Sequence, residues 1–210
     1  MSDVAVVKKL GIAHTLNEGM EICVKNIGPI LVNVVLWLLT VWIPYLNIGT
    51  TIGLTVGIVI KASKGEMISF TEIFDPKYRK YMGEFFLTSG LIGIGVGMGI
   101  ALFIIPGIVI GLAWTLALLL VIDKGKNATE SLTLSNNLTY GNKGRIFGLF
   151  AIAVVVFTVV QAVLTAIAAA SGSSALIGIM GFIVVLSSIF EVFVCIGLEA
   201  SIYKQLGGDV

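Results

Sequence analysis

The chain has 210 residues, of which 57% are hydrophobic and 12% charged, and its formal net charge is +1 at pH 7. A soluble domain lacks the polar surface to cover so apolar a core, and the near-zero net charge argues against nucleic acid as a partner. We therefore expect a single integral membrane domain, with any soluble activity supplied by a membrane or cytoplasmic protein partner.

Three long stretches carry no charged residue: 26–60, 85–122 and 146–190. One helical crossing takes about 20 residues, so each stretch is long enough to enter the bilayer and return. This predicts an all-α integral membrane protein with six membrane helices arranged as three hairpins. The expected single domain, 1–210, consists of an interfacial helix (1–26), a first hairpin (27–60), a linker (61–84), a second hairpin (85–122), a second linker (123–145) and a third hairpin (146–203).

Residues 4–26 are predicted to form an amphipathic helix on the bilayer surface, because their apolar residues recur at helical spacing. The first hairpin follows, with arms over 27–43 and 46–60 and a turn at Pro44. Trp42 lies where an outer aromatic belt is expected. The second arm is short, so either the bilayer thins, lysines snorkel, or the arm does not fully cross.

The second hairpin is predicted to run over 85–105, to turn at Pro106-Gly107 and to return over 108–122 in an equally short arm. The third hairpin has longer arms, 146–169 and 176–196, joined by a small polar turn. Basic residues gather in the linkers and near both ends, whereas the hairpin tips are uncharged. Basic residues flanking membrane helices stay in the cytoplasm, so both termini are expected there.

A faint internal repeat links the first two hairpins. Ile43-Pro44 is followed by Lys64-Gly65, and Ile105-Pro106 is followed at nearly the same distance by Lys124-Gly125. A Thr-Glu pair comes after each, at Thr71-Glu72 and Thr129-Glu130. The predicted unit is a surface helix and a hairpin, present three times with a degenerate third copy.

Several short motifs then carry a resemblance to a known family: Lys64-Gly65-Glu66 with Phe70 and Phe74, Ile105-Pro106-Gly107, and the segment from Glu130-Ser131-Leu132 through Ser135 to Arg145-Ile146-Phe147. On these the chain resembles a family of multi-pass bacterial membrane proteins related to the membrane domain of glycerophosphoryl diester phosphodiesterases. Relatives carry basic residues before the serine that aligns with Ser135, where this chain has Thr133 and Leu134, and no phosphodiesterase domain is found here. The resemblance implies a bacterial inner-membrane location and a role around lipids or the envelope.

No constellation for catalysis is visible. His14 is the one histidine, so no multi-histidine metal site can form within one chain. The glycine run 93–99 does not fit a dinucleotide-binding spacing, and the carboxylates are scattered singly. We expect no enzyme, no cofactor and no metal.

Three polar residues fall inside predicted membrane helices. Glu191 is the most informative, because an intramembrane carboxylate must be neutral, paired or hydrated. It either snorkels toward the surface beside Glu199 or forms a proton or cation site. Gln161 and Asn33 are expected to be interhelical hydrogen-bond partners.

The basic cluster Lys77, Arg79 and Lys80, flanked by Tyr78 and Tyr81, is a candidate contact for anionic lipid headgroups, each cation adding about 1 kcal/mol. The alternative is that these residues only enforce the topology.

Small residues four apart let helix backbones approach closely in lipid. They occur at Gly49, Gly53 and Gly57, and again at Gly93 and Gly97. Packing within one subunit and packing against a second copy are both open, and we predict a homo-oligomer.

Taken together, these features favour a non-enzymatic structural or accessory protein that organises the bilayer or a partner complex and associates with membrane lipids. The alternative is a small-solute transporter or channel with Glu191 near its pathway, and unchanged flux in Glu191→Gln would argue against that role. A lipid-active enzyme is a third hypothesis, disfavoured by the missing acid-base set.

Overall fold

The computed structural model describes residues 9–208. The part it describes contains six helical segments long and apolar enough to cross a membrane, which confirms the prediction of an all-α membrane protein. The elements are α1 (Ile12–Thr40), α2 (Pro44–Ile52), the π-helical turn η1 (Gly53–Gly57), α3 (Ile58–Ser63), the 3₁₀ turns η2 (Glu72–Phe74) and η3 (Pro76–Arg79), α4 (Met82–Leu102), α5 (Ile104–Ala113), α6 (Ala117–Lys124), α7 (Ala128–Thr139), α8 (Lys143–Ser171) and α9 (Ser174–Gly207).

The first helix differs from the prediction, which separated an interfacial helix ending at residue 26 from a membrane arm beginning at 27. In the structure α1 is continuous from Ile12 to Thr40 and contains Pro29. The apolar stripe stays in phase across the expected break, since Cys23 and Ile30 are both fully buried. Residues 1–8 of the expected interfacial helix lie outside the described residues.

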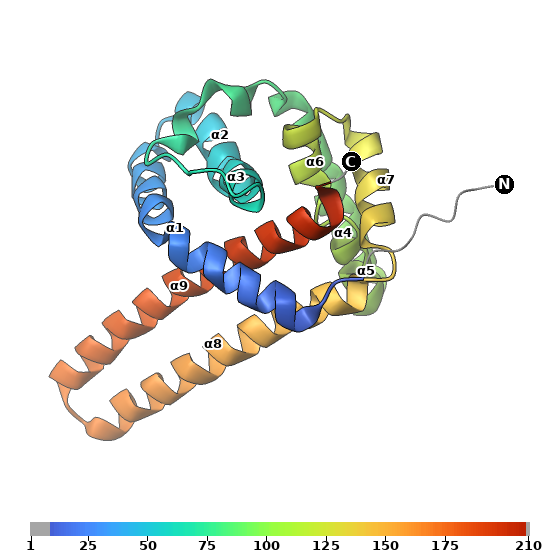
Figure 1. Cartoon of the computed structure of the whole chain (residues 1–210). Coiled ribbons are helices and arrows are strands. Elements are labelled where there is room, and N and C mark those ends of the chain that lie inside the picture. The colour runs from blue at the N-terminus through green and yellow to red at the C-terminus, as the bar shows by residue number, and fades with distance from the viewer. Residues whose placement is uncertain (1–8, 209–210) are drawn as a thin grey trace.

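The other helices form a ring around the C-terminal half of α9, which runs through the middle (Figure 1). This half supplies much of the core, including Leu198 and Tyr203. It crosses α1 at very short range, because a Cβ on Gly197 would lie 2.2 Å from the carbonyl oxygen of Gly19. Such a backbone approach needs glycine and gives the close packing that joins helices in lipid.

The second arms of the first two hairpins share one design. Each consists of an outer helix (α2 or α5), an irregular turn and a short inner helix (α3 or α6). Both inner helices are followed by a left-handed glycine, Gly65 with φ +69° and Gly125 with φ +63°, a conformation that glycine adopts without strain. The Lys-Gly pairs of the predicted repeat therefore mark equivalent helix ends.

The turn of the second hairpin lies slightly earlier than predicted. The chain reverses at Phe103, whose backbone is extended, and α5 begins at Ile104, so Pro106 lies in the first turn of that helix rather than in the loop. Proline is tolerated there because the first N–H groups of a helix have no intrahelical partner.

Polar linker segments pack against the irregular turns of both arms. In the first hairpin, the linker residues Ile73 and Tyr78 lie against Gly53 and Gly57 of η1. In the second, the Ser135 hydroxyl of α7 donates to the carbonyl oxygen of Ala113 at 2.7 Å. The second linker thus contains a helix, as the predicted repeat requires, whereas the first contains only the 3₁₀ turns η2 and η3.

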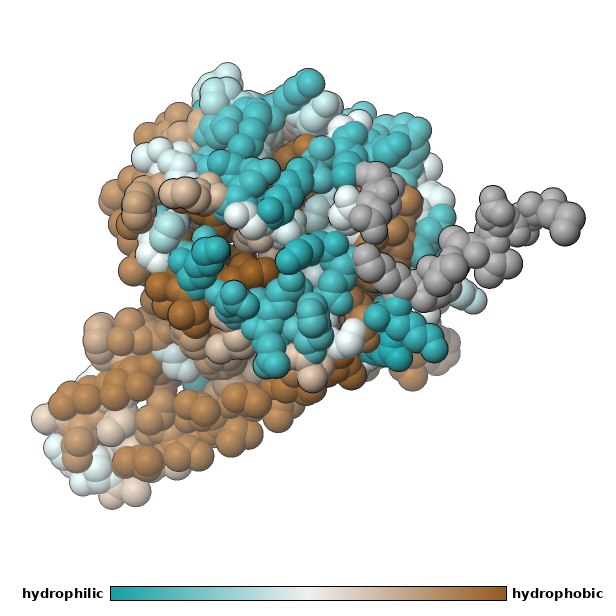
Figure 2. Space-filling model, viewed as in Figure 1, coloured by the Kyte–Doolittle hydropathy of each residue, from teal (hydrophilic) through white to brown (hydrophobic). Residues whose placement is uncertain are grey.

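The third hairpin is different, because its outer part leaves the ring. The helices α8 and α9 project together beyond the other elements (Figure 1). Along α9 the first buried residue is Phe193, and the stretch 174–192 packs against α8, with contacts such as that between Phe157 and Phe190. Figure 2 shows this projecting part as largely hydrophobic, whereas hydrophilic residues gather over the ring on the side toward the viewer.

Contacts among the charged ends of the hairpins define that polar face. Lys64, which caps α3, pairs with Asp123 at the end of α6. The Tyr203 hydroxyl of α9 donates to the same Asp123 at 2.8 Å, and Lys204 pairs with Glu18 of α1 at 2.7 Å. The hairpins therefore return to one side of the molecule, as the charge pattern predicts.

Candidate functional site

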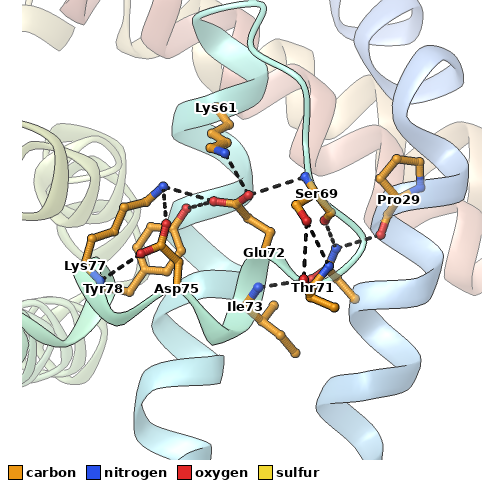
Figure 3. Close-up of polar contacts among 10 residues, drawn as sticks. Pro29, Lys61, Ser69, Thr71, Glu72, Ile73, Asp75, Lys77 and Tyr78 are labelled. Atoms are coloured by element: carbon orange, nitrogen blue, oxygen red, sulfur yellow. Dashed lines mark hydrogen bonds and ion pairs between the residues drawn. The ribbon is translucent and has the colours of Figure 1, made fainter.

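The centre of the polar face is a buried carboxylate, Glu72, in the first linker (Figure 3). One of its oxygens accepts from Lys77 Nζ at 3.0 Å and from the Tyr78 hydroxyl at 2.6 Å. The other accepts from Lys61 Nζ at 2.8 Å and from the backbone N–H of Ser69 at 3.3 Å. Only 2% of the Glu72 side chain is exposed, so its charge is held by protein donors rather than by water.

These donors determine the ionisation of the site. Burial by itself would raise the pKa of Glu72, but the hydrogen bonds from Lys61, Tyr78 and Lys77 outweigh burial and lower the pKa to about 2. Burial and the bond to Glu72 together raise the pKa of Tyr78, so its hydroxyl stays a donor. Glu72 is therefore ionised at neutral pH.

Asn33 joins this linker to α1. Its side-chain amide donates to the carbonyl oxygens of Pro29 and Ser69, both at 2.8 Å, and its side-chain oxygen accepts from the backbone N–H of Ile73 at 3.1 Å. Asn33 was expected to bond to another membrane helix; instead it is fully buried and satisfies the linker backbone. Asn33 forms no hydrogen bond with Gln161 or Glu191, which lie together in the third hairpin.

A cavity of about 260 Å³ lies between the ends of α3 and α6 and the start of α4, and its lining includes the three side chains that donate to Glu72. We call it the lysine cavity, because four lysines line it. Its lining residues are Ile60, Lys61, Lys64, Glu66, Lys77, Tyr78, Lys80, Tyr81, Ile122 and Asp123. Two of the three predicted headgroup contacts, Lys77 and Lys80, therefore lie beside Lys61 and Lys64, which were not predicted as headgroup contacts.

Arg79, the third predicted headgroup contact, points elsewhere. Its guanidinium lies 5.7 Å from the centre of the Tyr45 ring, and its Nε has no hydrogen-bond partner among the described residues. The side chain fits where Gly49 leaves room, since a Cβ on that glycine would lie 2.6 Å from Arg79 Nε. Arg79 thus packs along the membrane arm α2 and does not line the lysine cavity.

A second, larger cavity of about 470 Å³ lies beside α1 on the same face. Its charged lining residues are Glu18, Glu21 and Lys25 of α1, Glu66 of the loop after α3, and Lys204 of α9. Glu66 lines both cavities. No cluster of histidine, cysteine, aspartate and glutamate able to hold a metal ion occurs among the described residues.

Two of the predicted intramembrane polar residues lie together in the third hairpin. The side-chain amide of Gln161 donates to the Ser188 hydroxyl at 3.2 Å and reaches the Glu191 carboxylate at 3.5 Å. Ser188 is exposed, and the trio lies in the projecting part of α8 and α9. Glu191 lines none of the cavities described above.

The predicted glycine stripes have different environments. Gly49, Gly53 and Gly57 face Arg79, Ile73 and Tyr78 of the same chain, so this stripe is occupied by the first linker. In contrast, Cβ atoms on Gly93 and Gly97 would meet no atom of the described residues within 4 Å, apart from the backbone of their own helix. The first stripe therefore receives side chains of the linker rather than a second helix.

Sequence reasoning missed Glu72, Lys61 and Lys64 as parts of one site. The one available signal was the Thr-Glu pair of the repeat, and it is ambiguous, because its counterpart Glu130 is exposed. The glutamates of the two Thr-Glu pairs differ in their environment. The Glu72 carboxylate is surrounded by Lys61, Lys77 and Tyr78, whereas Glu130 lies at a helix start, where its backbone N–H donates to Asn127 Oδ1.

The helices and the polar face define a multi-pass, all-α membrane protein. Comparisons with protein-family models, curated proteins and solved structures found no match.

Proposed function

We propose that the protein is a non-enzymatic membrane protein that organises the bilayer, by inserting two short hairpins into one leaflet and one long hairpin across both. The supporting observation is the position along each membrane arm at which a polar linker packs against it, because a polar linker favours the headgroup region over hydrocarbon. The part of the arm between this position and the hairpin tip can insert into hydrocarbon, and its length differs greatly among the three hairpins.

In the first hairpin the linker packs at Gly53, the side chain of its Arg79 reaches along α2 to Gly49, and the nine residues of α2 lead from Gly53 to the tip. At 1.5 Å per residue they extend about 14 Å, roughly half of a hydrocarbon core of about 30 Å. The linker itself carries Asp75 and Lys77, which pair at 2.9 Å and favour the headgroup region. The tip of the first hairpin would then lie near the bilayer midplane, which replaces the position in an outer aromatic belt expected for Trp42 from the sequence.

The second hairpin repeats this arrangement. Polar α7 bonds to Ala113, the last residue of α5, and the other nine residues of α5 extend about 14 Å toward the tip. Its tip is entirely apolar: the side chains from Leu102 to Ile105 are 67–74% exposed. Such a tip suits hydrocarbon better than the headgroups of the opposite leaflet.

The third hairpin has the opposite character. The projecting stretch 174–192 of α9 extends about 28 Å, close to the full hydrocarbon thickness. Its tip is the polar turn formed by Ser171, Gly172, Ser173 and Ser174, which suits the far headgroup region. One hairpin would then anchor the protein across the bilayer while two displace lipid from the near leaflet.

Depth measurements test this arrangement directly. After replacement of Cys23 and Cys195, single nitroxide labels are placed at residue 103 or residue 173 of the protein in liposomes. We expect oxygen to accelerate the spin relaxation of the label at 103, and a nickel chelate to leave it unchanged when added on either side. The label at 173 should respond to nickel chelate added on the far side only. Access to residue 103 from that far side would refute the proposed insertion.

Self-association is part of the same proposal, and the Gln161, Ser188 and Glu191 trio supports it. In lipid, polar side chains on exposed helix faces find hydrogen-bond partners on other helices. The trio contains donors and acceptors, so two copies can satisfy each other's groups when their third hairpins pack together. In such a dimer the Gln161 side-chain amide of each copy would donate a hydrogen bond to the Glu191 carboxylate of the other copy.

Gln161→Leu should therefore weaken self-association by roughly five- to thirtyfold, the effect of losing about 1–2 kcal/mol of interhelical hydrogen bonding. The measurement is energy transfer between donor- and acceptor-labelled copies diluted in liposomes. Thr165→Val is the matched control, because among the described residues the Thr165 hydroxyl bonds only to the Gln161 carbonyl of its own helix. Equal energy transfer in Gln161→Leu and the wild type would rule out this role.

The polar face is proposed to lie in the cytoplasm and the membrane to be the bacterial inner membrane. The basic linkers and the resemblance given above support this placement. Intact cells are treated with a membrane-impermeant reagent that labels lysine. Labelling of Lys80 from outside would contradict the proposed orientation.

A further inference from the structure

We infer that the lysine cavity binds a phosphate group, carried by an anionic lipid headgroup or by a soluble phosphate ester. The inference does not rest on the insertion depth proposed above, because it follows from side chains on the polar face alone.

Four ammonium groups reach this cavity from two separate segments. Lys61 and Lys64 are three residues apart at the end of α3, and Lys77 and Lys80 are three apart in and after η3. Each spacing places both side chains of a pair on one side of its segment. The fold thus directs like charges into one space, an arrangement that an anion stabilises.

Carboxylates in and around the cavity neutralise most of the positive charge of its lysines. Glu66 and Asp123 line it, and Glu72 is shared by Lys61 and Lys77. Asp75 pairs with Lys77, and Lys124 lies 3.7 Å from Asp123. Four lysines and two carboxylates line the cavity, and with Glu72, Asp75 and Lys124 included the balance is five ammonium groups against four carboxylates.

Lys80 is the lysine that most needs an explanation. It forms no ion pair with any residue in the described part of the chain, and its ammonium group lies 5.0 Å from the centre of the Tyr81 ring. Lys64 and Lys77 are 44% and 48% exposed, so an entering ligand can reach them. Three ammonium groups are thus accessible at one opening, and one of them has no carboxylate partner.

The position of the cavity favours a headgroup as the carrier of the phosphate. It lies where α3 and α6 end at the polar face, with Ile60 and Ile122 in its wall. Basic pockets between membrane helices at this level bind anionic headgroups. Its volume of about 260 Å³ is below that of a pocket enclosing a drug-sized molecule, so it suits a headgroup whose acyl chains stay in the bilayer.

The experiment uses the purified full chain in detergent. Short-chain phosphatidylglycerol, short-chain phosphatidylcholine and soluble glycerol phosphate are titrated separately, and bound ligand is counted by native mass spectrometry. Glycerol phosphate is then added to the phosphatidylglycerol complex as a competitor. We expect phosphatidylglycerol to bind and Lys80→Gln to weaken it about fivefold, as one cation adds about 1 kcal/mol. Lys80→Arg should bind as the wild type does. Lys126→Gln, a polar-face lysine outside this cavity, should have no effect.

The two ligand sources give different outcomes. Binding of phosphatidylglycerol with no competition from glycerol phosphate identifies a lipid headgroup, and competition identifies a phosphate group that is also accepted in soluble form. The inference is overturned if Lys80→Gln and Lys126→Gln lower binding equally, or if phosphatidylcholine and phosphatidylglycerol bind alike in every variant. Unchanged elution of Lys80→Gln in size-exclusion chromatography shows that the variant is folded.

Discussion

Gly57→Ala should destabilise the protein by about 3 kcal/mol and release the first linker from the membrane arm. A Cβ at position 57 would lie 2.2 Å from Cζ and 2.6 Å from the hydroxyl oxygen of Tyr78. The Tyr78 ring is 1% exposed and bonds to Glu72, so it cannot move aside without breaking the buried site. Overpacking at such a position costs about 1–3 kcal/mol, and the disturbed bond to a buried charge adds to that loss.

Gly93→Ala is the matched control for this change. Gly93 also lies in a membrane helix, but a Cβ there would meet no atom of the described residues within 4 Å, apart from the backbone of its own helix. Alanine is favoured over glycine in helices, so this variant should be as stable as the wild type or slightly more stable. Thermal unfolding of both purified variants measures the difference. Similar melting temperatures for the two would contradict the tight fit of Tyr78 against Gly57.

Glu72→Gln should remove about 3 kcal/mol of stability at neutral pH. The folded protein lowers the pKa of Glu72 from 4.5 to about 2, and a drop of this size corresponds to about 3 kcal/mol of stabilisation. Because the folded pKa is the lower one, the stabilisation is fully present above about pH 4.5. It is lost as the pH falls toward 2, where the folded carboxylate is protonated as well.

Unfolding by denaturant, followed at several pH values in mixed micelles, measures this contribution. The wild type should lose stability between about pH 4.5 and 2, and Glu72→Gln should show a much flatter dependence in that window. Glu130→Gln is the control, because Glu130 occupies the matching position of the repeat but is exposed. A wild-type curve with the same slope as that of Glu72→Gln would show that Glu72 is not held ionised by its neighbours.

The membrane architecture could be predicted from the sequence because ionised side chains are excluded from hydrocarbon over long distances. The gaps between Lys25 and Lys61, Glu84 and Asp123, and Arg145 and Glu191 gave the hairpins without any knowledge of packing. The helix ends at Gly65 and Gly125 were also accessible, since a glycine after a lysine is a common helix stop.

Details that depend on tertiary packing could not be predicted. Nothing local marks Gly19 and Gly197 as the crossing of α1 and α9, because the two residues are far apart in the chain and belong to no visible stripe. The turn was predicted at Pro106 although the chain reverses at Phe103, because proline suits both a loop and the first turn of a helix. Likewise, the stripe Gly49, Gly53 and Gly57 indicated a close contact but not its partner.

The candidate site was only half visible for a related reason. Lys77 and Lys80 stood out as a charge cluster, yet Lys61 and Lys64 looked like ordinary flanking residues of a membrane helix. The two pairs become one site only when the linker folds back and Glu72 is buried between Lys61 and Lys77. Burial of a charge is a property of the folded chain, and composition gives no sign of it.

The unequal hairpins have a mechanical consequence. If only the third hairpin reaches the opposite leaflet, the protein is a wedge, broad among the lipids of one monolayer and narrow in the other. Asymmetric crowding of this kind generates spontaneous curvature, convex toward the side that bears Glu72 and its lysines. The protein would then partition into highly bent membranes, which a comparison of its density on small and large vesicles with the wide end outward would reveal.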